Sequence, residues 1–343
     1  MKCAAIDLFC GIGGLTHGFE QAGITVIAGI DIDGSCKFAY EKNNRATFIN
    51  NDIEELNTED LAKLYPDNTI KILMGCAPCQ PFSQYTKRYR KNGKKHEKWD
   101  LLYSFSNLVK GLKPEIISME NVPQLIKESV FKDYVMTLEK MNYHIFWEIV
   151  FCPDYGVPQN RKRLVLLASK LGEISLIPPI HKKENYLTVR HAIEKLPPIR
   201  DGEVCKFDTL HRASLLSKTN KKRIMQSKQG GTWKDWDEEL ILSCHKKKTG
   251  KGYSSVYGRM EWDKPSPTIT TKFYGYGNGR FGHPVQNRAL SLREGALLQS
   301  FPPSYVFVED GKNVRIRELG THIGNAVPVK LAKAIGISIN ILY

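Results

Sequence analysis

Several features that would place this sequence in a specialised class are missing from it. It has no run of about 18 apolar residues, so we expect no transmembrane helix and no membrane partner. Its first residues enter a strand pattern directly, without a long apolar signal region. The eight cysteines are scattered and lack the spacing of a disulfide framework. We therefore expect reduced thiols and a cytoplasmic, nucleoid-associated protein.

Acidic residues are also in short supply. The chain has 36 Asp and Glu against 50 Lys and Arg, which gives a net charge of +14 and a pI of about 9.3. Such an excess favours a polyanionic partner, nucleic acid first and a membrane surface second. The 343 residues are enough for two domains, and no internal repeat or low-complexity tract interrupts them.

The first half of the chain alternates strand and helix patterns, which is typical of an α/β domain. Strand patterns occupy residues 2–9, 25–30, 47–49, 70–73 and 115–119. Helix patterns follow some of them, at 35–42 and 133–141. Two further strands, 144–151 and 163–169, are predicted to form an antiparallel pair.

A glycine-rich turn follows the first strand, in the sequence DLFCGIGG, and a helix pattern begins after it. Glycines let the backbone approach a ligand at a helix N-terminus, although a turn without a ligand would use the same residues. Asp31 lies about 20 residues further on, at a strand end, where an acidic residue suits a ribose diol. Asp52 ends the third strand and could accept from an adenine amino group, or simply cap a helix.

The most informative stretch is MGCAPCQPFS, which follows the strand at 70–73. Two prolines flank Cys79 and prevent a simple continuation of strand or helix, so its thiol is expected on a stiff turn. Such a thiol can act as a nucleophile. The alternatives are a core thiol, or a redox pair or half of a zinc site with Cys76.

A basic segment, YTKRYRKNGKKHEKW at residues 85–99, comes next. It has seven cations: Lys87, Arg88, Arg90, Lys91, Lys94, Lys95 and Lys98. Charge runs are usually solvated surface. The interleaved aromatic residues and the tether to Cys79 favour a loop that closes on phosphates.

Two more polar clusters adjoin predicted strands. Glu120 ends the strand at 115–119, where an apolar setting could keep it protonated as an acid, although a structural cap is an equal alternative. The sequence QNRKR, residues 159–163, precedes the last strand, and its arginines could orient a carboxylate, a phosphate or a base.

From about residue 172 the α/β rhythm gives way to proline pairs, glycine-rich stretches and basic loops. We interpret this part as a second, irregular domain suited to backbone and base contacts. Helix patterns return at 291–299 and at 328–342, where Pro328 suits a first turn. The predicted domains are 1–171, 172–312 and a C-terminal segment, 313–343, that returns to the first domain.

Taken in order, these segments resemble the DNA cytosine-5 methyltransferase family. The resemblance rests on DLFCGIGG, PCQ at 78–80, ENV at 120–122, QNRKR at 159–163, RALSLREGALLQSFP at 288–302 and IGNAVP at 323–328. Each tripeptide alone is weak evidence, but the ordered set is specific and spans nearly the whole chain. It implies a Rossmann-like S-adenosylmethionine-dependent methyltransferase domain with a smaller, irregular target-recognition domain.

The resemblance also implies roles for individual residues. Cys79 would be the nucleophile, and Glu120, Arg161 and Arg163 would complete the catalytic group. No metal is implied. Cofactor contacts would come from Phe9, Gly11, Gly13, Gly14, Leu15, Asp31, Ile32, Asp52, Ile53, Pro78, Asn325 and Val327. DNA contacts would come from Gln80, Ser83, Lys87, Arg88, Arg90 and Thr270. Ile32 departs from the family, which often has an aromatic residue there, so adenine stacking would be weaker.

The expected activity is methylation of carbon 5 of a cytosine in duplex DNA, with base flipping and a covalent Cys79 adduct. The modest length, without a large regulatory extension, favours a prokaryotic modification enzyme, expected as a monomer beside a separately acting restriction endonuclease. The alternatives are a tRNA cytosine methyltransferase of the same family and a catalytically silent nucleic-acid-binding relative. A methylation assay on duplex DNA against tRNA separates the first, and cofactor consumption the second.

Overall fold

The computed structural model describes residues 2–78, 100–250, 252 and 254–342. The chain divides into two compact units, and each is described by itself. The first comprises Met1–Phe151, Lys162–Ile180 and Val327–Tyr343, and the second comprises Cys152–Arg161 and His181–Ala326. These limits differ from the predicted domain boundaries at 171 and 312, and the functional division of the chain stays a prediction.

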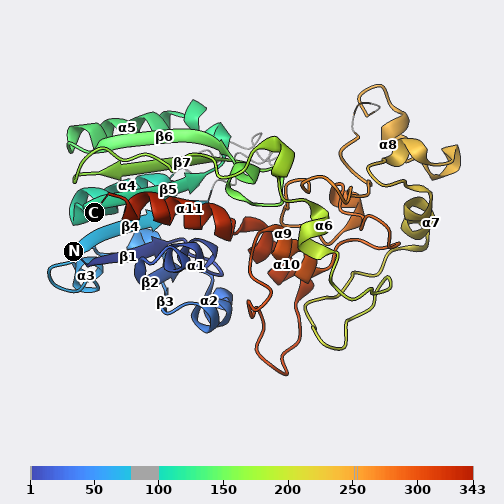
Figure 1. Ribbon diagram of the computed structural model, residues 1–343, viewed down its shortest axis with the longest axis horizontal. Helices are drawn as coiled ribbons and strands as arrows, with labels where there is room; N and C mark the ends of the chain where they lie inside the picture. The colour runs from blue at the N-terminus through green and yellow to red at the C-terminus, as the bar shows by residue number, and fades with distance from the viewer. Residues whose placement is uncertain (1, 79–99, 251, 253, 343) are drawn as a thin grey trace. The chain divides into compact units, whose positions relative to one another are not determined.

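The first unit is built on a seven-stranded sheet in the order β3-β2-β1-β4-β5-β7-β6 (Figure 1). Its strands are β1 (Cys3–Leu8), β2 (Thr25–Asp31), β3 (Thr47–Asn50), β4 (Ile70–Gly75), β5 (Ile116–Asn121), β6 (His144–Phe151) and β7 (Lys162–Ser169). Strands β1 to β5 pair in parallel, whereas β7 is antiparallel to both β5 and β6. The predicted α/β fold class and the predicted antiparallel pair are therefore confirmed.

Helices cover this sheet. They are α1 (Gly14–Gln21), α2 (Lys37–Asn43), α3 (Thr58–Lys63), α4 (Asp100–Leu112), α5 (Ser129–Lys140) and α11 (Val329–Asn340). Helices α1 and α11 run alongside each other (Figure 1), and a Cβ at Gly18 would lie only 2.3 Å from the Ala332 Cβ. Glycine at this position therefore permits the close approach that returns the C-terminal helix to the sheet. The sequence had not predicted α3 or α4, and α5 begins four residues before the predicted helix start.

Apolar side chains from α3, α4 and α5 pack on strands β1, β4 and β5 and form one continuous core. Phe105, Ile117 and Leu138 are completely buried in it. The parallel strands are thereby fixed with their carboxyl ends along one edge, where Leu8, Asp31, Gly75 and Asn121 end their strands. That edge is where open α/β sheets bind ligands.

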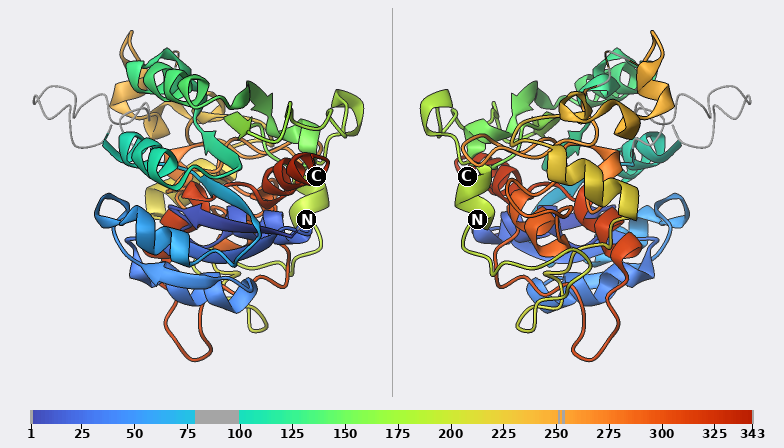
Figure 2. Two further views of the ribbon diagram at one scale, coloured as in Figure 1. Left: turned by 90° about the vertical axis from the view of Figure 1, so that its left-hand side faces the viewer. Right: turned by 90° about the vertical axis from the view of Figure 1, so that its right-hand side faces the viewer.

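The second unit has little regular structure. Its helices are α6 (Val189–Ile193), α7 (Lys218–Gln226), α8 (Ser243–Lys246), α9 (Leu292–Leu298) and α10 (Ile316–Asn325). Within its described residues, strand pairing is limited to isolated bridges such as Arg259 with Gly282. Its core is formed largely by aromatic side chains, and Trp233, Trp236 and Tyr276 are buried together in it. Figure 2 shows the short helices and long loops of this unit.

A search of the described helices finds none that is long and apolar enough to cross a membrane.

Candidate active site

The turn after β1 has the backbone of a ligand cradle. Phe9, Gly11 and Gly13 have φ angles of 60, 51 and 83°, in the left-handed region that favours glycine. Gly13 is the N-cap residue of α1. At Gly11, a Cβ would have no described atom within 4 Å. Open space beside a left-handed glycine, at a strand's carboxyl edge, fits the close approach of a ligand to the backbone.

Asp31 lies beside this turn, as the sequence predicted. Its Oδ2 accepts a hydrogen bond of 2.8 Å from the Gly11 backbone N–H, and its Oδ1 accepts one of 2.9 Å from Asp33 N–H. These two bonds fix the orientation of the carboxylate beside the turn. The next residue, Ile32, is 68% exposed, so its side chain is accessible to a ligand.

Asp52 and Ile53 follow β3 at the same edge. Asp52 Oδ1 accepts a hydrogen bond of 3.0 Å from Glu54 N–H and caps a short 3-10 helix. This is the structural alternative considered for Asp52, and its cofactor role stays a prediction. Ile53 is 3% exposed and belongs to the core of the first unit.

Asp7 lies on β1, just before the glycine turn, and is a buried carboxyl group. The side chain is 1% exposed, and Thr16 donates a hydrogen bond of 2.7 Å to its Oδ2. Oδ1 is buried with no hydrogen-bond partner among the described residues. Burial, opposed by the Thr16 bond and aided by the charge of Asp31, raises the pKa of Asp7 to about 7. The carboxyl is therefore substantially protonated near neutral pH.

Glu120 is buried at the carboxyl end of β5, with 2% of its surface exposed. Arg163 on β7 forms an ion pair with it, with 2.8 Å between Nε and Oε1. This pair lacks hydrogen-bond geometry, and Oε1 has no hydrogen-bond partner in the described part of the chain. A buried carboxylate oxygen without a donor is costly, and such a group commonly marks a functional site.

Cys76, which sequence reasoning weighed only as the partner of Cys79, contacts the same carboxylate. Its thiol donates to Glu120 Oε2 at 3.0 Å. The neighbouring residue Ala77 is also held, because Asn121 Nδ2 donates to its carbonyl oxygen at 3.1 Å. Both contacts arise because β4 and β5 are adjacent parallel strands paired in one particular register. The sequence does not reveal that register, so it could not predict the contacts.

Arg161 and Arg163 belong to different units. Within the second unit, Arg161 NH1 donates to the Ile269 carbonyl oxygen at 3.1 Å, and its side chain is buried. Gln159 binds the same segment, since its Oε1 accepts from Ile269 N–H at 2.9 Å. The described contacts of Arg161 are therefore structural, and its predicted catalytic role stays a prediction.

Thr270 lies next to this network. A Cβ at Gly324 would come within 2.5 Å of the Thr270 backbone carbon, so glycine in IGNAVP is required by close packing. Gln299 connects QNRKR with IGNAVP. Its Nε2 donates to Ile323 O at 2.7 Å, and its Oε1 accepts from Gln159. This buried amide network explains why QNRKR, the Thr270 segment and IGNAVP belong together, which their separation in the sequence concealed. Asn325 is exposed at the end of α10.

The remaining predicted residues fall into two groups. Gly14, Leu15 and Val327 are buried in the first unit, and Pro78 is exposed after β4. The other group lies outside the described residues and consists of Cys79, Gln80, Ser83, Lys87, Arg88 and Arg90. The predictions for these six residues and for the basic segment 85–99 are therefore untested.

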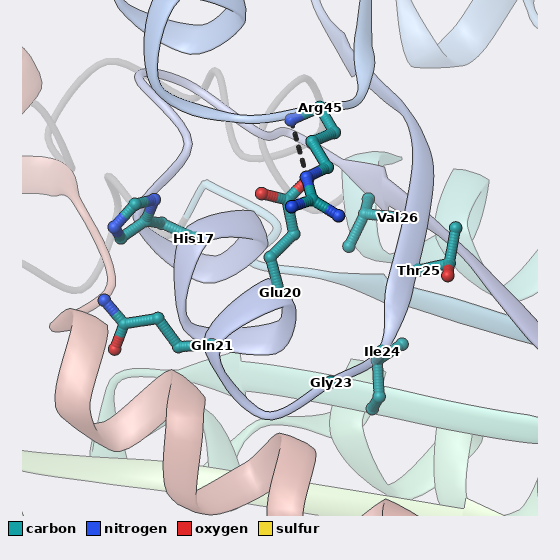
Figure 3. A pocket seen from close by; sticks show the side chains of 8 residues that line it. All are labelled: His17, Glu20, Gln21, Gly23, Ile24, Thr25, Val26 and Arg45. Carbon is teal, nitrogen blue, oxygen red and sulfur yellow. Dashed lines mark hydrogen bonds between the residues drawn. The ribbon is translucent and has the colours of Figure 1, made fainter.

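A cavity of about 340 Å³ lies elsewhere in the first unit, along α1 and the start of β2 (Figure 3). Within it, Glu20 Oε1 accepts a hydrogen bond of 2.8 Å from Arg45 N–H. Burial raises the pKa of Glu20. The lining contains no residue of the predicted site: His17, Glu20, Gln21, Gly23, Ile24, Thr25, Val26 and Arg45.

Comparison with known proteins identifies the relatives of this chain. A family model described as C-5 cytosine-specific DNA methylase matches residues 3–340. The chain is 54% identical over 342 residues to the type II methylase M.HgiDII of Herpetosiphon aurantiacus, covering 99% of this chain and 95% of the relative. It is 31% identical to the type II methyltransferase M.Sau96I of Staphylococcus aureus, covering 97% of this chain and 74% of the relative.

Solved structures show the same fold. A candidate DNA modification methyltransferase encoded in an Escherichia coli prophage superimposes with a TM-score of 0.76 at 22% identity, covering 99% of both chains. The methyltransferase EhMeth of Entamoeba histolytica does so with a TM-score of 0.67 at 17% identity, again over 99% of both chains. The fold is therefore the Rossmann-like fold of S-adenosylmethionine-dependent methyltransferases. From the match across nearly its whole length, the chain belongs to the C-5 cytosine-specific DNA methylase family.

Proposed function

We propose that this protein methylates carbon 5 of one cytosine within a specific duplex DNA sequence, with S-adenosyl-L-methionine as methyl donor. The observation that carries the proposal is the buried Glu120 carboxylate, which is ion-paired through Oε1 to Arg163 although no described residue donates a hydrogen bond to that oxygen. It lies on the same sheet edge as the Gly11 turn, in a chain that belongs to the DNA methylase family.

The residues of the glycine turn fit the methyl donor. Gly11 leaves open space beside the backbone, and two backbone N–H groups orient the Asp31 carboxylate, which would accept from the ribose hydroxyls. Exposed Ile32 would contact the adenine by apolar packing without aromatic stacking. When bound there, the sulfonium group of the donor supplies an electrophilic methyl group.

The base chemistry follows from the electron distribution of cytosine. Carbon 5 is a poor nucleophile, so the Cys79 thiolate first forms a bond to carbon 6 while Glu120 donates a proton or hydrogen bond to ring nitrogen 3. The displaced electron pair makes carbon 5 nucleophilic enough to take the methyl group. Loss of the carbon 5 proton to solvent then re-forms the double bond between carbons 5 and 6 and expels the thiolate, and ring nitrogen 3 gives its proton back to Glu120. Arg163 holds the Glu120 carboxylate in place throughout.

The DNA has to be deformed to reach these groups. Carbon 5 and carbon 6 of a paired cytosine are stacked in the duplex, so we propose that the base is flipped out, at a cost of a few kcal/mol. The net charge of +14 favours phosphate contacts that offset this cost. Relatives named as type II methyltransferases make a separate restriction endonuclease the proposed functional partner.

The test is methylation of duplex DNA against tRNA, followed by bisulfite sequencing of DNA from cells that express the protein. We expect incorporation of methyl groups into duplex DNA, with protected cytosines confined to one short sequence. Methylation of tRNA alone would overturn the proposed substrate. Binding of DNA without any consumption of S-adenosylmethionine would instead identify a silent relative.

A further inference from the structure

A second thiol, that of Cys76, follows the end of β4 and lies against the Glu120 carboxylate. Gly75, the last residue of β4, pairs with Met119 in the parallel register of β4 and β5, so Cys76, which follows β4, comes beside Glu120. Its Sγ lies 3.0 Å from Glu120 Oε2. Gly75 itself packs tightly, since a Cβ there would meet the Leu8 carbonyl oxygen at 2.6 Å. The strand end that bears Cys76 is therefore closely constrained.

The following residues are constrained as well. Asn121 Nδ2 donates to Ala77 O at 3.1 Å, and Asn121 Oδ1 accepts from Val122 N–H at 2.7 Å. This clamp joins the chain just after Cys76 to the chain just after Glu120. The Asn121 side chain therefore holds together the two chain segments that carry the thiol and the carboxylate.

The two oxygens of Glu120 consequently differ. Oε2 accepts from Cys76, whereas Oε1 lies 2.8 Å from Arg163 Nε and has no hydrogen-bond donor among the residues that the structure describes. A carboxylate held by one donor on one oxygen has a defined orientation, and its other oxygen remains available. Once protonated, that oxygen can donate a hydrogen bond or a proton to ring nitrogen 3 of the target cytosine.

We propose that Cys76 is a positioning residue, whose thiol holds Glu120 Oε2 so that Oε1 is presented to the target base. The inference rests on the proposed function, since it assigns Glu120 the role of binding the cytosine. Cys76 takes no covalent part in the reaction. It acts through the carboxylate, and its effect should disappear when the carboxylate is removed.

A double-mutant cycle tests this dependence. Single-turnover methyl transfer to duplex DNA is measured for wild type, Cys76→Ala, Glu120→Gln and the double variant. We expect Cys76→Ala to slow methyl transfer about five- to tenfold, which is the range for one weak donor to a charged acceptor. In the Glu120→Gln background the same substitution should change the rate less than about twofold, because a neutral amide oxygen accepts weakly from a thiol.

Two matched variants separate positioning from packing. Cys76→Ser retains a donor and should recover most of the rate, with the KM values for DNA and S-adenosylmethionine unchanged in both Cys76 variants. Cys205→Ala removes a buried thiol from the second unit and should react like wild type.

An unchanged rate in Cys76→Ala, equal losses in both backgrounds, or failure of Cys76→Ser to recover the rate would each overturn the positioning role. Those outcomes leave the proposed function intact if wild type methylates duplex DNA and Glu120→Gln is slow. Lack of methylation by wild type would instead contradict the proposed function itself.

Discussion

Glu120 in the first unit and Glu294 in the second are both buried carboxylates paired with an arginine, and their surroundings differ in one respect. Glu294 accepts from Arg288 on both oxygens, at 2.7 and 2.8 Å, and from Ser291 N–H at 2.7 Å. Glu120 accepts only from the weak Cys76 donor, and its Oε1 has no hydrogen bond within the described chain. One carboxylate is saturated and the other is not.

The difference is the one we expect between a structural carboxylate and a carboxylate that takes part in the proposed chemistry. The pKa of Glu294 is about 2. Burial alone would raise this pKa, but the charge and hydrogen bonds of Arg288 lower it by more. Such a group stays ionised and fixes the start of α9, where it completes a capping box with Ser291. An undersatisfied carboxylate at a strand end retains the capacity to bind a substrate.

Arg288→Met should have the largest effect, because it leaves the Glu294 charge buried without its partner. We expect a loss of about 3–5 kcal/mol in unfolding free energy, as measured for broken buried pairs. Calorimetry would show this as a large fall in the melting temperature. Arg315→Met, which removes an exposed ion pair with Glu318 in the same unit, is the control and should leave the melting temperature nearly unchanged. Similar melting temperatures for the two variants would contradict the structural role.

Glu120→Gln should show the opposite pattern, with lost chemistry and retained stability. The amide keeps the shape and loses the acid, so methyl transfer should fall about 10²-fold or more. The affinity for S-adenosylmethionine, measured by calorimetric titration, should change little. A large loss of cofactor affinity with normal methyl transfer would reverse the assignment of Glu120.

Asp7 is a third buried carboxylate, and no arginine among the described residues pairs with it. Its pKa of about 7 in the folded protein exceeds the value of 3.8 for an unperturbed side chain. Between these values the folded state binds the proton that the unfolded state releases, so Asp7 lowers stability progressively from about pH 4 to pH 7. Above pH 7 its unfavourable contribution is constant.

Asp7→Asn removes this titration and should therefore gain stability relative to wild type as the pH rises. We expect the difference in unfolding free energy between the variant and wild type to grow by roughly 1–3 kcal/mol from pH 5 to pH 8. Denaturation by urea at the two pH values measures it. If the difference in unfolding free energy between variant and wild type is the same at both pH values, Asp7 is ionised in the folded state at both.

The sequence predicted most of the first unit because apolar strand patterns and glycine or proline turns are local signals. Asp31 was correctly expected beside the glycine turn, since both follow parallel strands that share an edge. Helix α4 was not predicted, and its apolar positions in 100–112 directly follow the basic segment.

The contacts that decide the site could not be predicted in the same way. The bond from Cys76 to Glu120 spans 44 residues and depends on the register of β4 and β5. The Gln159 to Gln299 bond spans 140 residues within an irregular unit, where no periodic pattern indicates which segments meet. Neither partner identity nor burial of such amides is encoded in a local pattern.

In the proposed reaction, Cys79 attacks the target cytosine while Glu120 binds it. The most direct measurement uses duplex DNA with 5-fluorocytosine at the methylated position, incubated with the protein and S-adenosylmethionine. Fluorine cannot leave as a proton does, so we predict a covalent complex that survives denaturation. Mass spectrometry should locate the DNA on the Cys79 peptide, and Cys79→Ser should give no complex. Methylation of ordinary DNA without any trapped complex, or attachment to a different residue, would contradict the account.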